Sequence, residues 1–210
     1  MIYIVMIVIA YLLGSIPSGL WIGKYFYHKD IRKEGSGNIG TTNTFRVLGP
    51  KAGTVVLVMD ILKGTLAASQ PYLFHVNVNP LLIGLVASVG HTCSIFDNFH
   101  GGKAVATSAG ILLAYYPLLF VIASLVFISV ILLTSMVSCA SIIGVSTIFV
   151  IALCIHDHIL SIIAGIITLL IIVRHRSNIN RIIHGKESMV SFGLGHYLRE
   201  KRFNKVDCNK

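Results

Sequence analysis

The chain has 210 residues, of which 55% are hydrophobic and only 12% are charged, and its mean hydropathy is +0.82. Because soluble domains carry about 25% charged residues, this composition excludes an ordinary water-soluble fold. The net charge of +9 is not accompanied by a nucleic-acid-binding motif, so no nucleic-acid partner is expected. We expect an all-α integral membrane protein with a single membrane-embedded domain over residues 1–210.

Apolar runs of about 20 residues recur along the chain, and each is long enough to cross roughly 30 Å of hydrocarbon. The first run has no basic signal-peptide region before it, so we expect it to remain in the mature protein. One stretch is too long for a single span, and Tyr115-Tyr116-Pro117 divides it because a residue before proline avoids the α region. About seven transmembrane helices are predicted, at about 1–23, 51–73, 80–97, 104–133 in two parts, 140–155 and 159–173.

The basic residues are strongly segregated along the chain. Apart from Lys63 and Lys103, every Lys and Arg lies in residues 24–51 or 174–210. With seven spans, the loops at 24–50, 97–103 and 134–141 share one side of the membrane with the tail, and the loops on the other side contain no Lys or Arg. The positive-inside rule makes the basic side cytoplasmic. We therefore expect a multi-pass protein of the cell membrane, with the N-terminus outside and the C-terminus in the cytoplasm.

The segment Gly35–Arg46 reads GSGNIGTTNTFR and is the most unusual polar part of the chain. Its glycines allow close approach to an anion, its successive N–H groups form a nest for phosphate oxygens, and Arg46 offers a two-pronged donor. The segment also matches G-x-G-x-x-G, but that fingerprint requires a preceding strand, and here a membrane span precedes it. A phosphate-binding loop is predicted, with a flexible surface turn as the alternative.

Three further polar clusters fall on the predicted cytoplasmic side. Gly101-Gly102-Lys103 suits an anion, although taken alone a lysine that snorkels at the membrane edge is the simpler interpretation. Two pairs are spaced i, i+3 and would share a helix face: His175 with Asn178, and Ser138 with Ser141. The serines alternatively form a helix cap. Because these clusters and the Gly35–Arg46 segment share one side, we expect them to form a single site for an anionic substrate.

The remaining polar features have plainer interpretations. Asp60 and Lys63 lie near the middle of a span at i, i+3, where a buried structural pair is as plausible as a catalytic role. His156 and His158 flank Asp157 in an outer turn that we interpret as solvated. The four cysteines lack metal spacing and are expected to be reduced thiols. No metal and no cofactor are predicted.

Five motifs together resemble the acyl-phosphate-dependent glycerol-3-phosphate acyltransferases of the PlsY type. The similarity runs nearly end to end, and the Gly35–Arg46 segment is its most specific part. Two departures are His100, where the family usually has Lys or Arg, and Ala104, where glycine is frequent. The other motifs lie at Gly14–Gly19, Asp60–Gly64, Gly90–Thr107 and His175–Glu187.

The resemblance implies that an acyl group passes from acyl phosphate to the 1-hydroxyl of glycerol 3-phosphate. The products would be lysophosphatidate and inorganic phosphate, in the first acylation of bacterial phospholipid synthesis. Acyl phosphate and glycerol 3-phosphate would be the substrates, the lipid bilayer the environment, and the enzyme that makes acyl phosphate a functional partner.

The residues and the resemblance together give a predicted site. The catalytic group consists of Lys103, His175, Arg46 and Ser36. The general base stays open among His175, His91 and a substrate phosphate oxygen, because positioning and electrostatics supply much of the rate. The predicted substrate-binding residues are Gly37, Asn38, Thr41, Asn43, His91, Gly101, Gly102, Ser138, Ser141, Asn178 and Glu187.

Two alternatives belong to other functional classes. A transporter of a phosphorylated solute would share the basic loops, but it must bind from both sides, and the outer loops lack cations. A non-catalytic scaffold with a lipid-binding basic tail would leave the Gly35–Arg46 segment and Lys103 unexplained.

Overall fold

A computed structural model of the chain describes residues 1–207, and within them the regular secondary structure is helical. The α-helices are α1 (Ile2–Ser15), α2 (Ser18–Tyr27), α3 (Thr41–Leu48), α4 (Pro50–Leu73), α5 (Pro80–Thr92), α6 (Val105–Tyr115), α7 (Pro117–Thr134), α8 (Val137–Cys154), α9 (His158–Arg174), α10 (Arg176–Ile183) and α11 (Leu194–Asp207). Two short 3₁₀ turns, η1 (Ile31–Lys33) and η2 (Ile95–Asp97), lie in the connections. The all-α prediction is confirmed.

Membrane-spanning length is reached by fewer helices than the sequence predicts. Among the described residues, α4, α7 and α8 are each long and apolar enough to cross a bilayer. The number rises to five if α1–α2, bent by 48°, and α9–α10, bent by 61°, each count as one span. The apolar helices α5 and α6 have only 13 and 11 residues. The structure therefore supports three to five spans by length and composition.

Several predicted boundaries agree with the structure. The predicted run at 51–73 forms α4, and the break at Tyr115-Tyr116-Pro117 is confirmed, since α6 ends at Tyr115 and α7 begins at Pro117. Pro117 tolerates the first helical position because its missing N–H would have no partner there. The predicted run at 80–97 is too long, because α5 ends at Thr92 and the backbone leaves the helical region at Cys93.

The first apolar run is broken at Pro17. Ile16, the residue before the proline, has φ −56° and ψ 113°, which is outside the helical region, as expected for that position. The break frees backbone carbonyls that a continuous helix would bond. The Lys63 ammonium on α4 donates to the Ile16 carbonyl at 2.8 Å and satisfies one of them.

Close packing of α4 against α6 depends on glycine. A Cβ at Gly64 would collide with the Thr107 carbonyl, and a Cβ at Gly110 would collide with the Ile61 carbonyl. Small residues at such contacts let two helix backbones approach, which is the usual basis of helix association in membranes. The D-x-x-K-G motif thus ends in a glycine that the helix contact requires.

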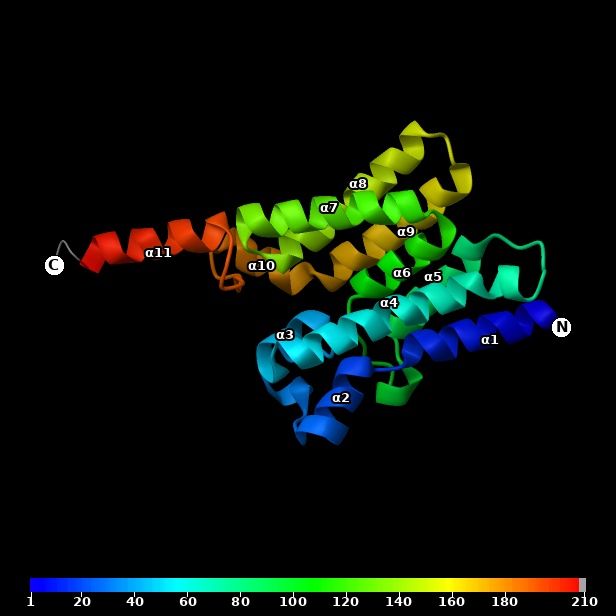
Figure 1. The fold of residues 1–210 in the computed structure, drawn as a ribbon, viewed down its shortest axis with the longest axis horizontal. Helices are drawn as coiled ribbons and strands as arrows, with labels where there is room; N and C mark the ends of the chain where they lie inside the picture. The colour runs from blue at the N-terminus through cyan, green and yellow to red at the C-terminus, as the bar shows by residue number, and fades with distance from the viewer. Residues whose placement is uncertain (208–210) are drawn as a thin grey trace.

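The elements are arranged along one long axis (Figure 1). The N-terminus, the α4–α5 turn and the α8–α9 turn lie toward one end, and α2, α3, α10 and α11 lie toward the other. The end that contains α2, α3, α10 and α11 is called the basic end. Of these elements, α3 and α10 were expected to be loop or tail, but both are helices of eight residues. The polar elements of the chain therefore gather at one end of the bundle.

Candidate active site

A chain of polar contacts starts at Lys103. Lys103 lies just before α6, and its ammonium donates to the side-chain oxygen of Asn178 on α10. The other side of the same amide, Nδ2, donates to Oε1 of Glu187 at 2.6 Å. Asn178 and Glu187 are both buried. These contacts bring together the loop before α6, helix α10 and the segment after it.

Glu187 is the acceptor at which this network converges. Ser138, in the first turn of α8, donates to Oε1 at 2.7 Å, and Arg181 donates through Nε to Oε2 at 2.8 Å. Burial alone would raise the Glu187 pKa, but the hydrogen bonds from Asn178, Ser138 and Arg181 outweigh it and lower the pKa below its usual range. Glu187 is therefore a carboxylate that fixes its three donors.

The charge environment of Lys103 is unusual for a lysine. Burial lowers its pKa to about 8, the Glu187 carboxylate opposes this, and the positive charges of Arg181, Arg174 and Arg46 lower it further. Arg46 belongs to α3, so the end of the Gly35–Arg46 segment lies within electrostatic range of Lys103. Four cations from three parts of the chain thus face a common region, which is suited to a phosphate dianion.

The Gly35–Arg46 segment is braced from within. The buried Asn43 accepts from the Ser36 N–H at 2.8 Å and donates to the Ile31 and Glu34 carbonyls at 2.9 and 3.1 Å. Asn38 accepts from the Gly40 N–H at 2.9 Å. The contacts of the Asn43 and Asn38 side chains are with backbone groups, so these contacts stabilise the conformation of the loop. Ser36, Gly37 and Arg46 remain exposed.

Both glycines that open this segment have positive φ, 61° at Gly35 and 71° at Gly37. Left-handed backbone of this kind favours glycine and turns successive N–H groups toward one side. Gly40 then caps α3, whose first turn leaves N–H groups without helical partners. The N–H groups of Ser36, Gly37 and Gly40 are bonded within the loop, to Asn43 Oδ1, the Glu34 carbonyl and Asn38 Oδ1, so the N–H groups left for an anion are those of the first turn of α3.

The double glycine before Lys103 is held between two elements. Gly102 donates its N–H to the His91 carbonyl at 3.0 Å, and Arg174 donates through Nε to the Gly102 carbonyl at 3.1 Å. Arg174 also donates to the Gly101 carbonyl. A Cβ at Gly102 would collide with the His91 ring. The two glycines are therefore required by close packing, which places Lys103 beside α10.

The two predicted site histidines have fixed rings. Nδ1 of His91 lies 3.1 Å from the Thr107 hydroxyl. Nδ1 of His175, a buried residue between α9 and α10, lies 2.8 Å from the Ile171 carbonyl. A carbonyl only accepts, so Nδ1 of His175 carries the proton, and Nε2 is the nitrogen that holds the lone pair in the neutral ring.

Asp60, on α4, contacts the Gly14–Gly19 motif through Ser18. Its Oδ1 receives the Lys63 ammonium and the Ser18 hydroxyl, each at 2.9 Å, and its Oδ2 lies 3.4 Å from the hydroxyl of Thr41. Asp60 and Lys63 are both buried. The pair therefore ties α4 to the α1–α2 break and to the start of α3.

The other predicted residues differ in their surroundings. Ser141 donates to the Val137 carbonyl of its own helix at 2.8 Å, one turn away from the contact that Ser138 makes. Arg174 and Arg181 were not among the predicted site residues, because a basic flank after a last span is ordinary topology. The HR-x-N-I-x-R pattern contained Arg181 as a possible signal, but only the fold shows that Arg181 pairs with Glu187.

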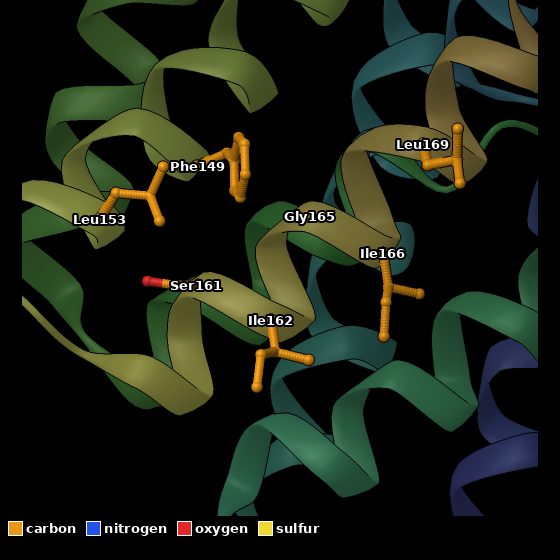
Figure 2. Close-up of a pocket in the computed structure, with 7 residues that line it drawn as sticks. All are labelled: Phe149, Leu153, Ser161, Ile162, Gly165, Ile166 and Leu169. Atoms are coloured by element: carbon orange, nitrogen blue, oxygen red, sulfur yellow. The ribbon is translucent and has the colours of Figure 1, made fainter.

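An apolar hollow lies apart from this network, between α8 and α9 (Figure 2). It has a volume of about 400 Å³ and is lined by Phe149, Leu153, Ser161, Ile162, Gly165, Ile166 and Leu169. Leu153 and Ser161 place it near the α8–α9 turn, toward the end of the molecule opposite α10 (Figure 1). It contains none of the charged groups described above.

Comparison with known proteins gives consistent results. The family model described as "Glycerol-3-phosphate acyltransferase" matches residues 4–185. A protein of that name from Limosilactobacillus reuteri (strain DSM 20016) is 76% identical over 202 residues, covering 95% of this chain and 97% of the relative. Another from Latilactobacillus sakei subsp. sakei (strain 23K) is 58% identical over 197 residues, covering 93% and 96%.

Solved structures resemble this one closely. The crystal structure of PlsY (YgiH), an integral membrane glycerol 3-phosphate acyltransferase, in its glycerol 3-phosphate form has a TM-score of 0.84 and 36% identity, covering 89% of this chain and 94% of that one. Its lysophosphatidic acid form has a TM-score of 0.80 and 35% identity, with the same coverage. Sequence and fold agree, and the chain belongs to the glycerol-3-phosphate acyltransferase family.

Proposed function

We propose that this protein transfers an acyl group from acyl phosphate to the 1-hydroxyl of glycerol 3-phosphate, yielding lysophosphatidate and inorganic phosphate. The observation that carries the proposal is the contact network from Lys103 through Asn178 to Glu187, with Arg46, Arg174 and Arg181 around it. The reaction handles two phosphates, and Lys103 with Arg46, Arg174 and Arg181 supplies four cations in this region. The relatives' names and the glycerol 3-phosphate form of the solved structure support glycerol 3-phosphate as the acceptor.

The reaction needs no intermediate on the enzyme, because acyl phosphate is already an activated donor. The 1-hydroxyl oxygen of glycerol 3-phosphate forms a bond to the acyl carbonyl carbon, and the bond from that carbon to the phosphate oxygen breaks. The hydroxyl proton passes to a base, and phosphate leaves with the electron pair. Holding both reactants in line supplies a large part of the acceleration.

We assign roles by what each side chain has free. Lys103 and Arg46 stabilise negative charge that develops on the leaving phosphate, and the Ser36 hydroxyl with the Thr41 N–H group binds phosphate oxygens, while Gly37 shapes the turn by donating to the Glu34 carbonyl. His175 and Asn178 position glycerol 3-phosphate, with Glu187 and Ser138 behind them. Nε2 of His175 and a substrate phosphate oxygen are the preferred candidates for the base, because Nδ1 of His91 contacts Thr107 and its Nε2 packs against Gly102.

The membrane arrangement is part of the proposal. We propose seven crossings, in which α1–α2, α4, α5, α6, α7, α8 and α9 each cross once and the basic end faces the cytoplasm of a bacterial cell. The one-sided distribution of Lys and Arg supports this orientation. The acyl chain of the donor then lies among the helices while its phosphate reaches the loops.

Cysteine accessibility tests the orientation. The four native cysteines are replaced by serine, and a single cysteine is introduced at the exposed Lys33 or at the exposed Asn77 in the α4–α5 turn. A membrane-impermeant maleimide applied to intact cells should label Asn77→Cys only, and both variants after lysis. Labelling of Lys33→Cys in intact cells would refute the orientation.

A donor comparison tests the chemistry. Purified protein receives labelled glycerol 3-phosphate with palmitoyl phosphate, palmitoyl-CoA or palmitoylated acyl carrier protein. We expect labelled lysophosphatidate from palmitoyl phosphate alone. A preference for either thioester would reject the proposed donor. Uptake of labelled glycerol 3-phosphate into protein-containing vesicles without product would instead favour the transporter.

A further inference from the structure

The connection between α10 and α11, together with the first turn of α11, is anchored on one residue, Ser135, at the junction of α7 and α8. The Ser135 carbonyl accepts from the Val190 N–H at 2.8 Å, and its hydroxyl oxygen accepts from the His196 N–H at 2.9 Å. Ser135 is completely buried and has a left-handed backbone, with φ 58°. One residue therefore holds both ends of the Val190–His196 segment.

Two glycines let that segment lie flat against the end of α7. Gly193 has φ 93°, and a Cβ there would lie 2.7 Å from the Ser135 hydroxyl oxygen and 2.8 Å from the Leu132 carbonyl oxygen. A Cβ at Gly195 would collide with the Thr134 carbonyl. These contacts depend on backbone approach, because side chains would separate the segment from α7.

The anchor lies next to the contacts of Glu187. In the tail, Val190 follows Glu187 by three residues. At the α7–α8 junction, Ser138 follows Ser135 by three residues, and it donates to Glu187 at 2.7 Å. The α7–α8 junction therefore holds the tail segment at two neighbouring points. One of these points is the carboxylate that receives the Asn178 amide.

We infer that Ser135, Gly193 and Gly195 form a latch that positions the Glu187 carboxylate, and through Asn178 the Lys103 ammonium. Ser135 is thus a positioning residue for the reaction, and this inference rests on the proposed function. The residues of the latch are distinct from those assigned to bind substrate. They lie partly beyond residue 185, where the family match ends.

The latch adds little to the hydrophobic core. Phe192 and Leu194 of the Val190–His196 segment, and Tyr197 and Leu198 just after it, are all exposed, at 49% or more of their surface. Docking of this segment therefore buries little apolar surface, and its loss should leave thermal stability nearly unchanged. The hydrogen bonds at Ser135 therefore act mainly by fixing the position of the Glu187 carboxylate.

The test compares Ser135→Ala with Ser124→Ala in purified full-length protein. Ser124 is a matched control, since it lies on α7 and its hydroxyl donates to the Phe120 carbonyl of its own helix. Ser135→Ala should lower kcat about tenfold with a near-normal melting temperature. It should also move the alkaline limb of kcat/KM to lower pH, because a displaced Glu187 no longer raises the pKa of Lys103. Ser124→Ala should match the wild type in all three.

A second variant and a second readout keep the inference testable apart from catalysis. Gly195→Ala should reproduce the shift of the pH limb, and trypsin should cut after Lys186 faster in both latch variants than in Ser124→Ala. Equal cleavage in all variants would overturn the latch, and faster cleavage with an unmoved limb would overturn the positioning role. A wild-type protein that is inactive with palmitoyl phosphate would defeat the proposed function, while the cleavage rates would still report on the latch.

Discussion

Lys103 and Glu187 carry opposite charges, and the single amide of Asn178 joins them. Its oxygen accepts from the Lys103 ammonium, and its nitrogen donates to the Glu187 carboxylate at 2.6 Å. The two charges therefore define which way the amide is turned. The arrangement keeps the lysine beside the carboxylate network without a direct ion pair, so its charge is available to a phosphate.

Lys103→Ala and Arg46→Ala should each lower kcat about a hundredfold or more, the usual effect of removing a group that stabilises transition-state charge. Lys51→Ala is the control, because Lys51 is an exposed cation at the start of α4 with no assigned role. Initial rates with palmitoyl phosphate, together with melting temperatures, are the measurement. Near-normal turnover in either site variant would refute the assignment of that residue.

The rate should depend on pH through Lys103. Its pKa is lowered to about 8, so the ammonium is charged below that pH and neutral above it. We expect kcat/KM to fall as the pH rises through about 8, rather than near the usual 10.5 of lysine. Lys103→Arg keeps its charge throughout this range, so its residual activity should lack that limb. An identical limb in the arginine variant would assign the titration to another group.

Asp60→Asn should destabilise the protein. It leaves the buried Lys63 ammonium without its carboxylate, and breaking a buried pair typically costs about 3–5 kcal/mol. The double variant Asp60→Asn, Lys63→Met removes both charges and should recover part of the melting temperature in detergent. A single variant that melts normally but is inactive would instead give the pair a catalytic role.

Gly110→Ala should weaken the contact between α4 and α6, because the added Cβ meets the Ile61 carbonyl. Overpacking of this kind typically costs about 1–3 kcal/mol. Gly144→Ala is a matched control, since Gly144 is also buried in a helix but its nearest neighbour would be the Ala123 carbonyl oxygen at 3.9 Å. Equal melting temperatures for the two variants would show that the close contact between α4 and α6 does not contribute to stability.

Much of the helix framework could be predicted from the sequence. The run at 51–73 became α4 because it is long, apolar and opened by proline, and Pro117 produced the break before α7. By contrast, α3 is only eight residues long and mixed in polarity, so no apolar run reveals it. It is stabilised by tertiary burial of Asn43 and Thr44, which a local pattern does not show.

Candidate residues for the site could be chosen from the sequence, but most of their contacts could not. Glycine, lysine and the His-x-x-Asn spacing singled out Lys103, His175 and Asn178 as candidates from local pattern. The contacts of Arg174 with the Gly101 and Gly102 carbonyls, and of Ser135 with the tail, join segments that are distant in sequence. Their partners are backbone groups, which every residue possesses, so side-chain identity gives no signal for them.

We propose that the acyl group passes from acyl phosphate to glycerol 3-phosphate beside Lys103. The most direct measurement is the stoichiometry of palmitoyl phosphate consumed, phosphate released and labelled lysophosphatidate formed by the wild type, Lys51→Ala and Lys103→Ala. We expect equal amounts of palmitoyl phosphate consumed, phosphate released and lysophosphatidate formed in the wild type and in Lys51→Ala, and almost no product in Lys103→Ala. Phosphate release without lysophosphatidate, or equal product from Lys103→Ala, would contradict it.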